Sequence, residues 1–256
     1  MFGAAARRTV VGMTTSTGAG LIIESRYNGP PSSGHGGVAA GRMAELVDPR
    51  AAVVRLLAPI PLGTPLRPAG AADAVVRMCA GEQAVATVGP LPAPLDVGRF
   101  APPRAEEIQQ AELGWLSVSD GVHPFPTCFG CGPDRPRRDG LGLRPGRVRG
   151  TEVCATRWTP PGSGEVPAWL VWAALDCGSA GPVIGAGPPG GPVVTGELAA
   201  EIRQTVRGGH PYALLSKLVR RSGRKTITQA ALVDDAGRHV AVGITTWFTL
   251  TGERAG

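Results

Sequence analysis

The feature that most constrains the fold is a pattern that occurs twice along this chain of 256 residues. Each copy has a β-rich run, a loop rich in Gly, Pro and Ser, one helix, and then several β-rich runs separated by turn residues. The two predicted helices, 35–47 and 166–177, lie about 130 residues apart. A single helix followed by a meander of strands favours an α+β arrangement, in which a curved antiparallel sheet wraps around a central helix. The sequence thus predicts two such sheets, one in each half.

The predicted borders follow from turn residues. The loops 28–34 and 159–165 precede the two helices, and a Pro-rich segment, 91–126, contains a short helical piece at 104–113. We expect this segment to link a first unit, 14–90, to a second unit, 127–251. Hairpin turns are predicted at 80–82 and 235–237. The predicted strands are 20–27, 51–62, 74–78, 83–88, 140–144, 151–158, 193–206, 212–219, 226–234 and 239–250.

The composition argues for a folded domain. Gly (38) and Pro (25) make up about a quarter of the residues, which approaches the share found in disordered chains. Hydrophobic residues nevertheless reach 43%, charged residues only 18%, and the apolar positions fall into runs that can form a core. An odd number of cysteines, five, favours a reducing compartment, and neither a secretion signal nor a membrane span is evident. We therefore expect a cytoplasmic protein without a membrane partner.

The chain carries a net charge of +6, and nearly all of its basic residues are arginines. Only Lys217 and Lys225 are lysines among the 26 basic residues, a skew typical of genomic composition bias. The arginines are spread along the chain without an interleaved aromatic motif, so a nucleic-acid partner is not expected. The positive net charge would equally well attract a polyanionic small molecule such as a coenzyme A thioester.

Two motifs carry a family resemblance. His35-Gly-Gly37 opens the first helix, and Cys128-Phe-Gly-Cys-Gly-Pro133 is followed by Gly140-Leu-Gly-Leu143. With the strand, loop, helix and enclosing sheet, these motifs resemble hot-dog fold acyl-CoA thioesterases, in the branch that includes 4-hydroxybenzoyl-CoA and phenylacetate-pathway thioesterases. The resemblance covers most of residues 20–250. Two units in one chain imply a double hot-dog, a covalent version of the usual dimer, and leave a homodimer of double hot-dogs open.

The resemblance implies hydrolysis of an acyl-CoA or acyl-carrier thioester without a cofactor. In the family, a backbone N–H at a helix N-terminus polarises the thioester carbonyl, where unpaired N–H groups and the helix dipole favour an oxyanion. A carboxylate eight residues further along, contributed across the interface, then activates water or attacks directly.

Neither half contains both the helix-opening glycine and the carboxylate eight residues after it. Eight residues after Gly36 stands Ala44, and eight residues before Asp176 stands Ala168 without a His-Gly-Gly motif. We therefore expect one composite site. Its predicted members are His35, Gly36 and Gly37 from the first half and Asp176 from the second.

Two further residues follow from the resemblance. Thr195 opens the strand after the second helix, where the family places a Ser or Thr that orients the water. Asn28 lies one residue from the position at which some members carry an Asn that helps to bind the carbonyl.

No metal site is expected from the spacings. Cys128-x-x-Cys131 lacks a second Cys or His pair at the spacing of a four-ligand site, which favours a structural turn. The Gly-rich segment 185–192 lacks the Lys-Ser/Thr ending of a phosphate loop and is expected to be a plain loop or a lid.

Two other functions remain open on the sequence. Enoyl-CoA hydratases and dehydratases of the same fold pair an Asp with a His five residues later, where this chain has Gly181, although His35 opposite Asp176 could supply the pair across the halves. A non-catalytic acyl-CoA-binding protein is the other alternative, because Ala44 already replaces one carboxylate.

Overall fold

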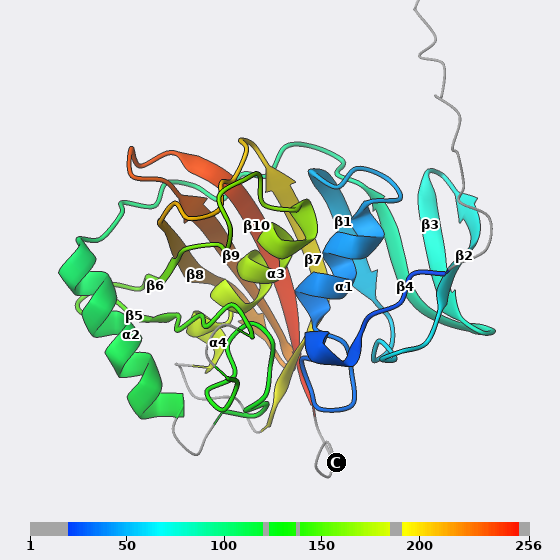
Figure 1. The fold of residues 1–256 in the computed structure, drawn as a ribbon, viewed down its shortest axis with the longest axis horizontal. Coiled ribbons are helices and arrows are strands. Elements are labelled where there is room, and N and C mark those ends of the chain that lie inside the picture. Colours follow the sequence, from blue (N-terminus) through cyan, green and yellow to red (C-terminus); the bar gives the residue numbers. More distant parts are fainter. Residues whose placement is uncertain (1–19, 120–122, 137–138, 185–190, 251–256) are drawn as a thin grey trace, which may run out of the picture.

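The computed structural model describes residues 20–119, 123–136, 139–184 and 191–250. Within them, ten strands form one antiparallel sheet in the order β2-β3-β4-β1-β7-β10-β9-β8-β6-β5 (Figure 1). The strands are β1 (Ala51–Leu56), β2 (Leu66–Ala72), β3 (Val75–Ala80), β4 (Gln83–Pro90), β5 (Gly146–Arg147), β6 (Cys154–Trp158), β7 (Val193–Ile202), β8 (Tyr212–Ser222), β9 (Lys225–Val233) and β10 (His239–Thr249). The helices are the 3-10 helix η1 (Ser25–Tyr27) and the α-helices α1 (Gly36–Ala44), α2 (Ala105–Ser119), α3 (Ala168–Gly178) and α4 (Gly181–Ile184).

The prediction of two separate sheets is wrong. Strand β1 of the first half pairs antiparallel with β7 of the second, in a register that runs from Ala51 opposite Glu201 to Arg55 opposite Glu197. An edge strand presents a row of unpaired backbone N–H and C=O groups. Joining the two halves edge to edge satisfies both rows and produces one continuous sheet.

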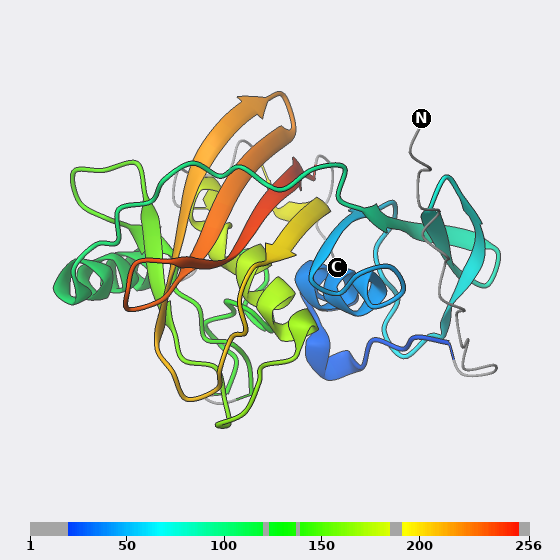
Figure 2. The same ribbon diagram turned by 90° about the horizontal axis from the view of Figure 1, so that it is seen from above.

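The two central helices lie side by side on the concave face of this sheet (Figure 2). Their contact is close because α1 presents glycines to α3. A Cβ atom at Gly41 would lie 2.5 Å from the Cα of Trp169, and one at Gly37 would lie 2.8 Å from the Cα of Ala173. The small residues of the first helix therefore allow the two helices to pack closely.

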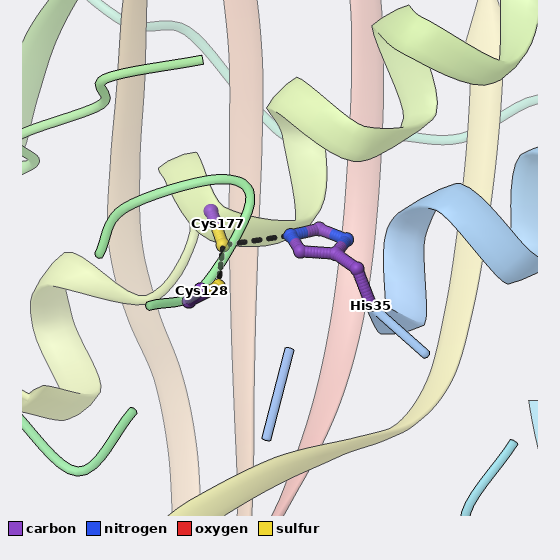
Figure 3. Close-up of side chains that lie close together, drawn as sticks. All are labelled: His35, Cys128 and Cys177. Carbon is purple, nitrogen blue, oxygen red and sulfur yellow. Dashed lines mark hydrogen bonds between the residues drawn. The ribbon is translucent and has the colours of Figure 1, made fainter. Parts of the chain in front are cut away.

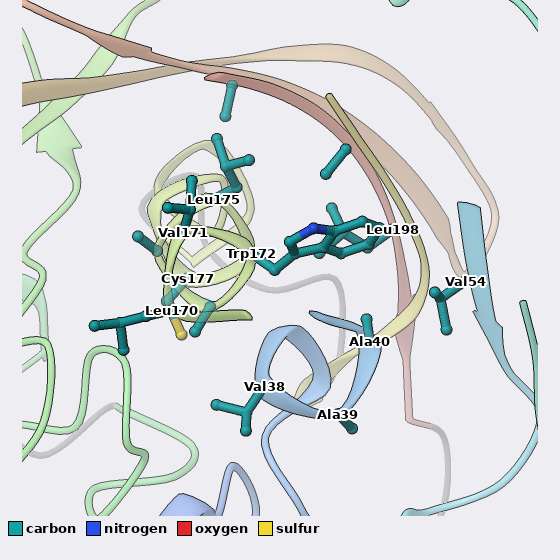
Figure 4. Close-up of a cluster of buried hydrophobic side chains, with 14 of the residues drawn as sticks. Val38, Ala39, Ala40, Val54, Leu170, Val171, Trp172, Leu175, Cys177 and Leu198 are labelled. Atoms are coloured by element: carbon teal, nitrogen blue, oxygen red, sulfur yellow. The ribbon is translucent and has the colours of Figure 1, made fainter. Parts of the chain in front are cut away.

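The main core fills the space between the helices and the sheet (Figure 4). Trp172 of α3 is fully buried there, in the same cluster as Val54 of β1 and Leu198 of β7. Because α3 is apolar almost all round, its residues 170–178 can all be buried.

The outer face of the sheet has a second core. Side chains alternate along the strands, so that Leu214 faces the helices while Leu215 belongs to the outer cluster. That cluster is covered by the segment between the two halves, through Val97, Phe100 and Ile108. The connecting segment thus packs against the sheet in addition to joining its halves.

Several element predictions are confirmed and others need correction. Hairpin turns occur at both predicted places, with positive φ at Gly81 (58°) and Gly237 (76°). The run 20–27 is not a strand but an isolated bridge at Leu21 followed by η1, and residues 140–144 form no strand. Strand β2 was not expected, because its sequence LRPAGAA contains a Pro and a Gly that normally interrupt strands.

The ends of several helices and strands also differ from the predicted ends. Helix α1 ends at Ala44, three residues before the predicted end, and β1 ends at Leu56. The piece predicted at 104–113 extends to Ser119 in α2, whereas α4 was not predicted. Among the described residues, no helix combines the length and hydrophobicity that crossing a bilayer requires.

Candidate functional site

A cavity of about 460 Å³ lies between the two halves, at the N-terminus of α1. Its walls are mostly apolar and include Leu56 and Ile60 from the first half, Phe125 from the connecting segment, and Ile184 and Trp247 from the second half. His35, Gly36, Asp176 and Thr195 also line the cavity. The fold therefore brings together residues that are up to 160 positions apart in the sequence.

Asp176 is the central charged group of this site. It lies near the end of α3, with only 2% of its surface exposed. Its Oδ2 accepts the N–H of Gly37 at 2.6 Å, and its Oδ1 accepts the hydroxyl of Thr195 at 2.8 Å. Burial raises the pKa of Asp176, and nearby His35, Thr195 and Gly37 only partly offset this, so its pKa lies above the ordinary value. A carboxylate in this state is a stronger base than one in water.

Both glycines at the start of α1 are required by close approach. A Cβ atom at Gly36 would lie 2.7 Å from the side chain of Thr195, and one at Gly37 would lie 2.5 Å from the Cβ of Asp176. The Gly37 N–H is already engaged by Asp176, whereas the Gly36 N–H finds no acceptor among the described residues and borders the cavity. Gly36 is thus the backbone donor available to a bound ligand.

His35 caps the same helix. Its Nδ1 accepts the N–H of Val38 at 3.2 Å and lies 3.6 Å from Oδ2 of Asp176, while its Nε2 lies 3.0 Å from the sulfur of Cys177 (Figure 3). Burial lowers the pKa of His35, but the neighbouring Cys128 and Asp176 raise it more, and the net pKa is above the ordinary value. The imidazole therefore links the carboxylate to a group of cysteines.

Three cysteine sulfurs meet beside His35. The separations are 3.7 Å between Cys128 and Cys177, 4.0 Å between Cys128 and Cys131, and 3.4 Å between Cys131 and Cys177. The neighbouring Cys131 and Cys177 thiols hold the pKa of Cys128 well below its usual range. A second imidazole, that of His123, lies 3.3 Å from the sulfur of Cys131. The spacing of Cys128 and Cys131 could not reveal this cluster, because its third sulfur comes from α3.

Asn28 lies outside the cavity lining. Its Nδ2 donates to the carbonyl of Gly29 and to the hydroxyl of Thr127, and its Oδ1 accepts from Arg135 at 2.8 Å. Its carbonyl also accepts the N–H of Phe129. The structure therefore places Asn28 as a support of the cysteine loop.

Most of the segment 185–192, which was expected to be a plain loop or a lid, lies outside the described residues, because these end at residue 184 and resume at residue 191.

Comparisons with solved structures match this architecture over nearly the whole chain. A hot-dog protein from Alicyclobacillus acidocaldarius superposes with a TM-score of 0.52 over 90% of this chain and 92% of its own, at 12% identity. This chain has the hot-dog fold. A candidate thioesterase from Novosphingobium aromaticivorans gives 0.55 over 88% and 91% at 15% identity. The acyl-CoA thioesterase II TesB2 from Mycobacterium marinum gives 0.50 over 85% and 90% at 13% identity.

The hot-dog assignment rests on the structure alone. No protein-family model matches the sequence, and no curated protein matches it. At identities of 12–15% the similarity concerns the arrangement of helices and strands. What the site does must therefore be argued from its own residues.

Proposed function

We propose that this hot-dog protein hydrolyses the thioester of an acyl-CoA or an acyl-carrier protein, as a double hot-dog whose two units share one site. The observation that carries the proposal is the buried Asp176 carboxylate at the wall of an apolar cavity, opposite the N-terminus of α1. An oxyanion donor and a base thus border the same space, as acyl transfer requires. The neighbouring folds named as thioesterases support the same reaction class.

The helix N-terminus would stabilise the charge that develops on the carbonyl oxygen. We place the thioester oxygen at the N–H of Gly36, where the dipole of α1 adds a positive potential. Gly37 and His35 are assigned positioning roles. The Gly37 N–H holds Oδ2 of Asp176, and His35 caps the helix.

Asp176 would act as the base. A water molecule attacks the thioester carbon and gives its proton to Asp176, and the tetrahedral intermediate then collapses and expels the thiolate, which takes up a proton. Direct attack by the carboxylate, followed by hydrolysis of the resulting anhydride, reaches the same products. In both routes the Thr195 hydroxyl orients the carboxylate through Oδ1.

The cavity favours an acyl group of modest size. Its walls are mostly apolar, and its volume of about 460 Å³ lies within the range of small-molecule sites. The coenzyme A portion of the substrate would remain outside the cavity, where the net charge of +6 favours association with its phosphates. We expect no cofactor in this reaction.

The test is a thiol-release assay over aryl, short-chain and long-chain acyl-CoAs with wild type and Asp176→Asn. The amide has the size of the carboxylate but is not a base, so hydrolysis should fall by about a hundredfold or more. Circular dichroism and the melting temperature check that the fold is retained. Full activity of Asp176→Asn would exclude the mechanism, and tight acyl-CoA binding without turnover by wild type would identify a binding protein instead.

A hydratase is the second candidate, because the His35 imidazole lies 3.6 Å from the Asp176 carboxylate and could form an acid–base pair with it. The Nε2 of His35 is already in contact with the sulfur of Cys177, which disfavours a hydratase. Incubation with an enoyl-CoA separates the two reactions. Loss of the conjugated thioester absorbance without thiol release indicates hydration.

A further inference from the structure

We propose that Cys128, Cys131, Cys177 and His35 form a binding site for one zinc ion. Cys128 and Cys131 lie in the loop 128–131, Cys177 lies at the end of α3, and His35 precedes α1. Thiolate sulfur and imidazole nitrogen are the ligands that zinc prefers, and a Cys₃His set is typical of structural sites. This inference does not depend on the proposed hydrolase activity.

The distances between the sulfurs fit a single tetrahedral ion. Zinc–sulfur bonds of about 2.3 Å place the sulfurs of a tetrahedral site about 3.8 Å apart. The three separations here, 3.4, 3.7 and 4.0 Å, bracket that value. A ring nitrogen of His35 and the sulfurs of Cys128 and Cys177 all lie within 4.8 Å of one another. Cys131 joins this group through its sulfur contacts with Cys128 and Cys177, and we infer that it shifts toward His35 when the ion binds. An iron–sulfur cluster would need wider spacing, because its cysteine ligands bind different iron atoms.

The loop is shaped around the sulfurs and supported before any ion binds. A Cβ atom at Gly130 would lie 2.3 Å from the sulfur of Cys177, so only glycine fits there. The loop is held by hydrogen bonds from the Phe129 N–H to the Asn28 carbonyl and from the Leu143 N–H to the Gly130 carbonyl. All four ligand residues are buried. Such a preformed, buried pocket lowers the cost of ordering the ligands.

A carboxylate faces His35 on the side where metal-bound imidazoles usually have a hydrogen-bond acceptor. Binding through Nε2 moves the ring proton to Nδ1, which faces Oδ2 of Asp176 at 3.6 Å. The Val38 N–H, which Nδ1 accepts without the ion, then gives up that bond. The three thiols release their protons to solvent as they bind, which leaves a site of net charge −1. The guanidinium of Arg135 acts electrostatically on His35 and partly offsets that charge.

Four protein ligands leave no open coordination position, which is typical of a structural ion. The ion would tie the loop 128–131 to the end of α3 and to His35, which precedes α1. It would thereby hold the wall of the cavity on which Asp176 lies.

The experiment measures zinc by elemental analysis in protein purified without chelators, and follows Co²⁺ uptake by absorption spectroscopy. We expect about one zinc ion per chain and an intense thiolate-to-Co²⁺ charge-transfer band. Cys128→Ser, Cys131→Ser and Cys177→Ser should each lower that band by about a third and lose zinc to a chelator that wild type resists. Cys79→Ser is the matched control, because Cys79 is also buried but lies outside the cluster.

The fourth ligand is tested separately. We expect His35→Asn to weaken zinc binding by at least about tenfold and His123→Gln to leave it unchanged. The opposite pattern would overturn the assignment of His35. Wild-type protein that contains no zinc and shows no Co²⁺ charge transfer would overturn the site, and so would equal metal content in wild type and all three cluster variants.

Discussion

Asp176 shows how one residue acquires its chemistry from its surroundings. A lone carboxylate buried in an apolar helix would be costly, but two donors hold its oxygens in place and leave it facing a cavity. Neither donor is near it in sequence. Gly37 belongs to the first half of the chain, and Thr195 lies 19 residues further on.

Thr195 is expected to act through Asp176. Thr195→Val removes the hydroxyl that donates to Oδ1, a charged hydrogen bond worth about 1.5–3 kcal/mol, so kcat should fall by about one to two orders of magnitude. Because the hydroxyl is engaged with Asp176, KM should change little. Thr195→Ser should restore most of the activity. An unchanged kcat in Thr195→Val, measured by thiol release, would contradict the positioning role.

At the scale of elements, the contact between α1 and α3 decides how the site is assembled. It brings the N-terminus of one helix to the last turn of the other, and it depends on glycines one turn apart. Glycine normally weakens a helix, so its presence at Gly37 and Gly41 indicates a tertiary requirement.

Gly41→Ala is therefore expected to destabilise the protein although alanine favours helices. The added Cβ would lie 2.5 Å from the backbone of Trp169, and such overpacking costs about 1–3 kcal/mol. Gly114→Ala in α2 is the control, because its Cβ would meet no atom within 4 Å, and it should stabilise by about 0.5–1 kcal/mol. Urea denaturation measures both. Equal effects of the two substitutions would show that helix propensity, not packing, governs α1.

On the scale of the whole molecule, the continuous sheet makes the two halves one structural unit. The pairing of β1 with β7 and the packing of α1 on α3 both cross between the halves. The connecting segment adds a third link, because it covers the outer face of the second half.

We accordingly expect a single cooperative thermal transition. Separated halves would expose a sheet edge and the apolar faces of both helices, so neither half should unfold alone. Calorimetric and van't Hoff enthalpies should agree, and Val54→Ala in β1 should lower the one melting temperature. Two resolved transitions, or a shift confined to one of them, would show that the halves fold separately.

The sequence by itself determined most of the long elements, and its resemblance to a family suggested the members of the candidate site. The periodicity of the runs, the loops before the helices and the glycine-marked hairpins are local properties, so α1, α3 and the strands β7 to β10 could be predicted. The composite of His35, Gly36, Gly37, Asp176 and Thr195 was expected from the family resemblance and its spacing. In the structure four of these residues line one cavity, and Gly37 lies behind them and donates its N–H to Asp176.

Only the tertiary structure decided how these parts meet. The union of two expected sheets into one depends on pairing between strands about 150 residues apart, and no local pattern encodes that register. The third sulfur beside Cys128 and Cys131 comes from a helix whose apolar sequence gave no sign of a ligand role. Long-range contacts of this kind arise from the packing of complementary surfaces, which a reading of adjacent residues does not contain.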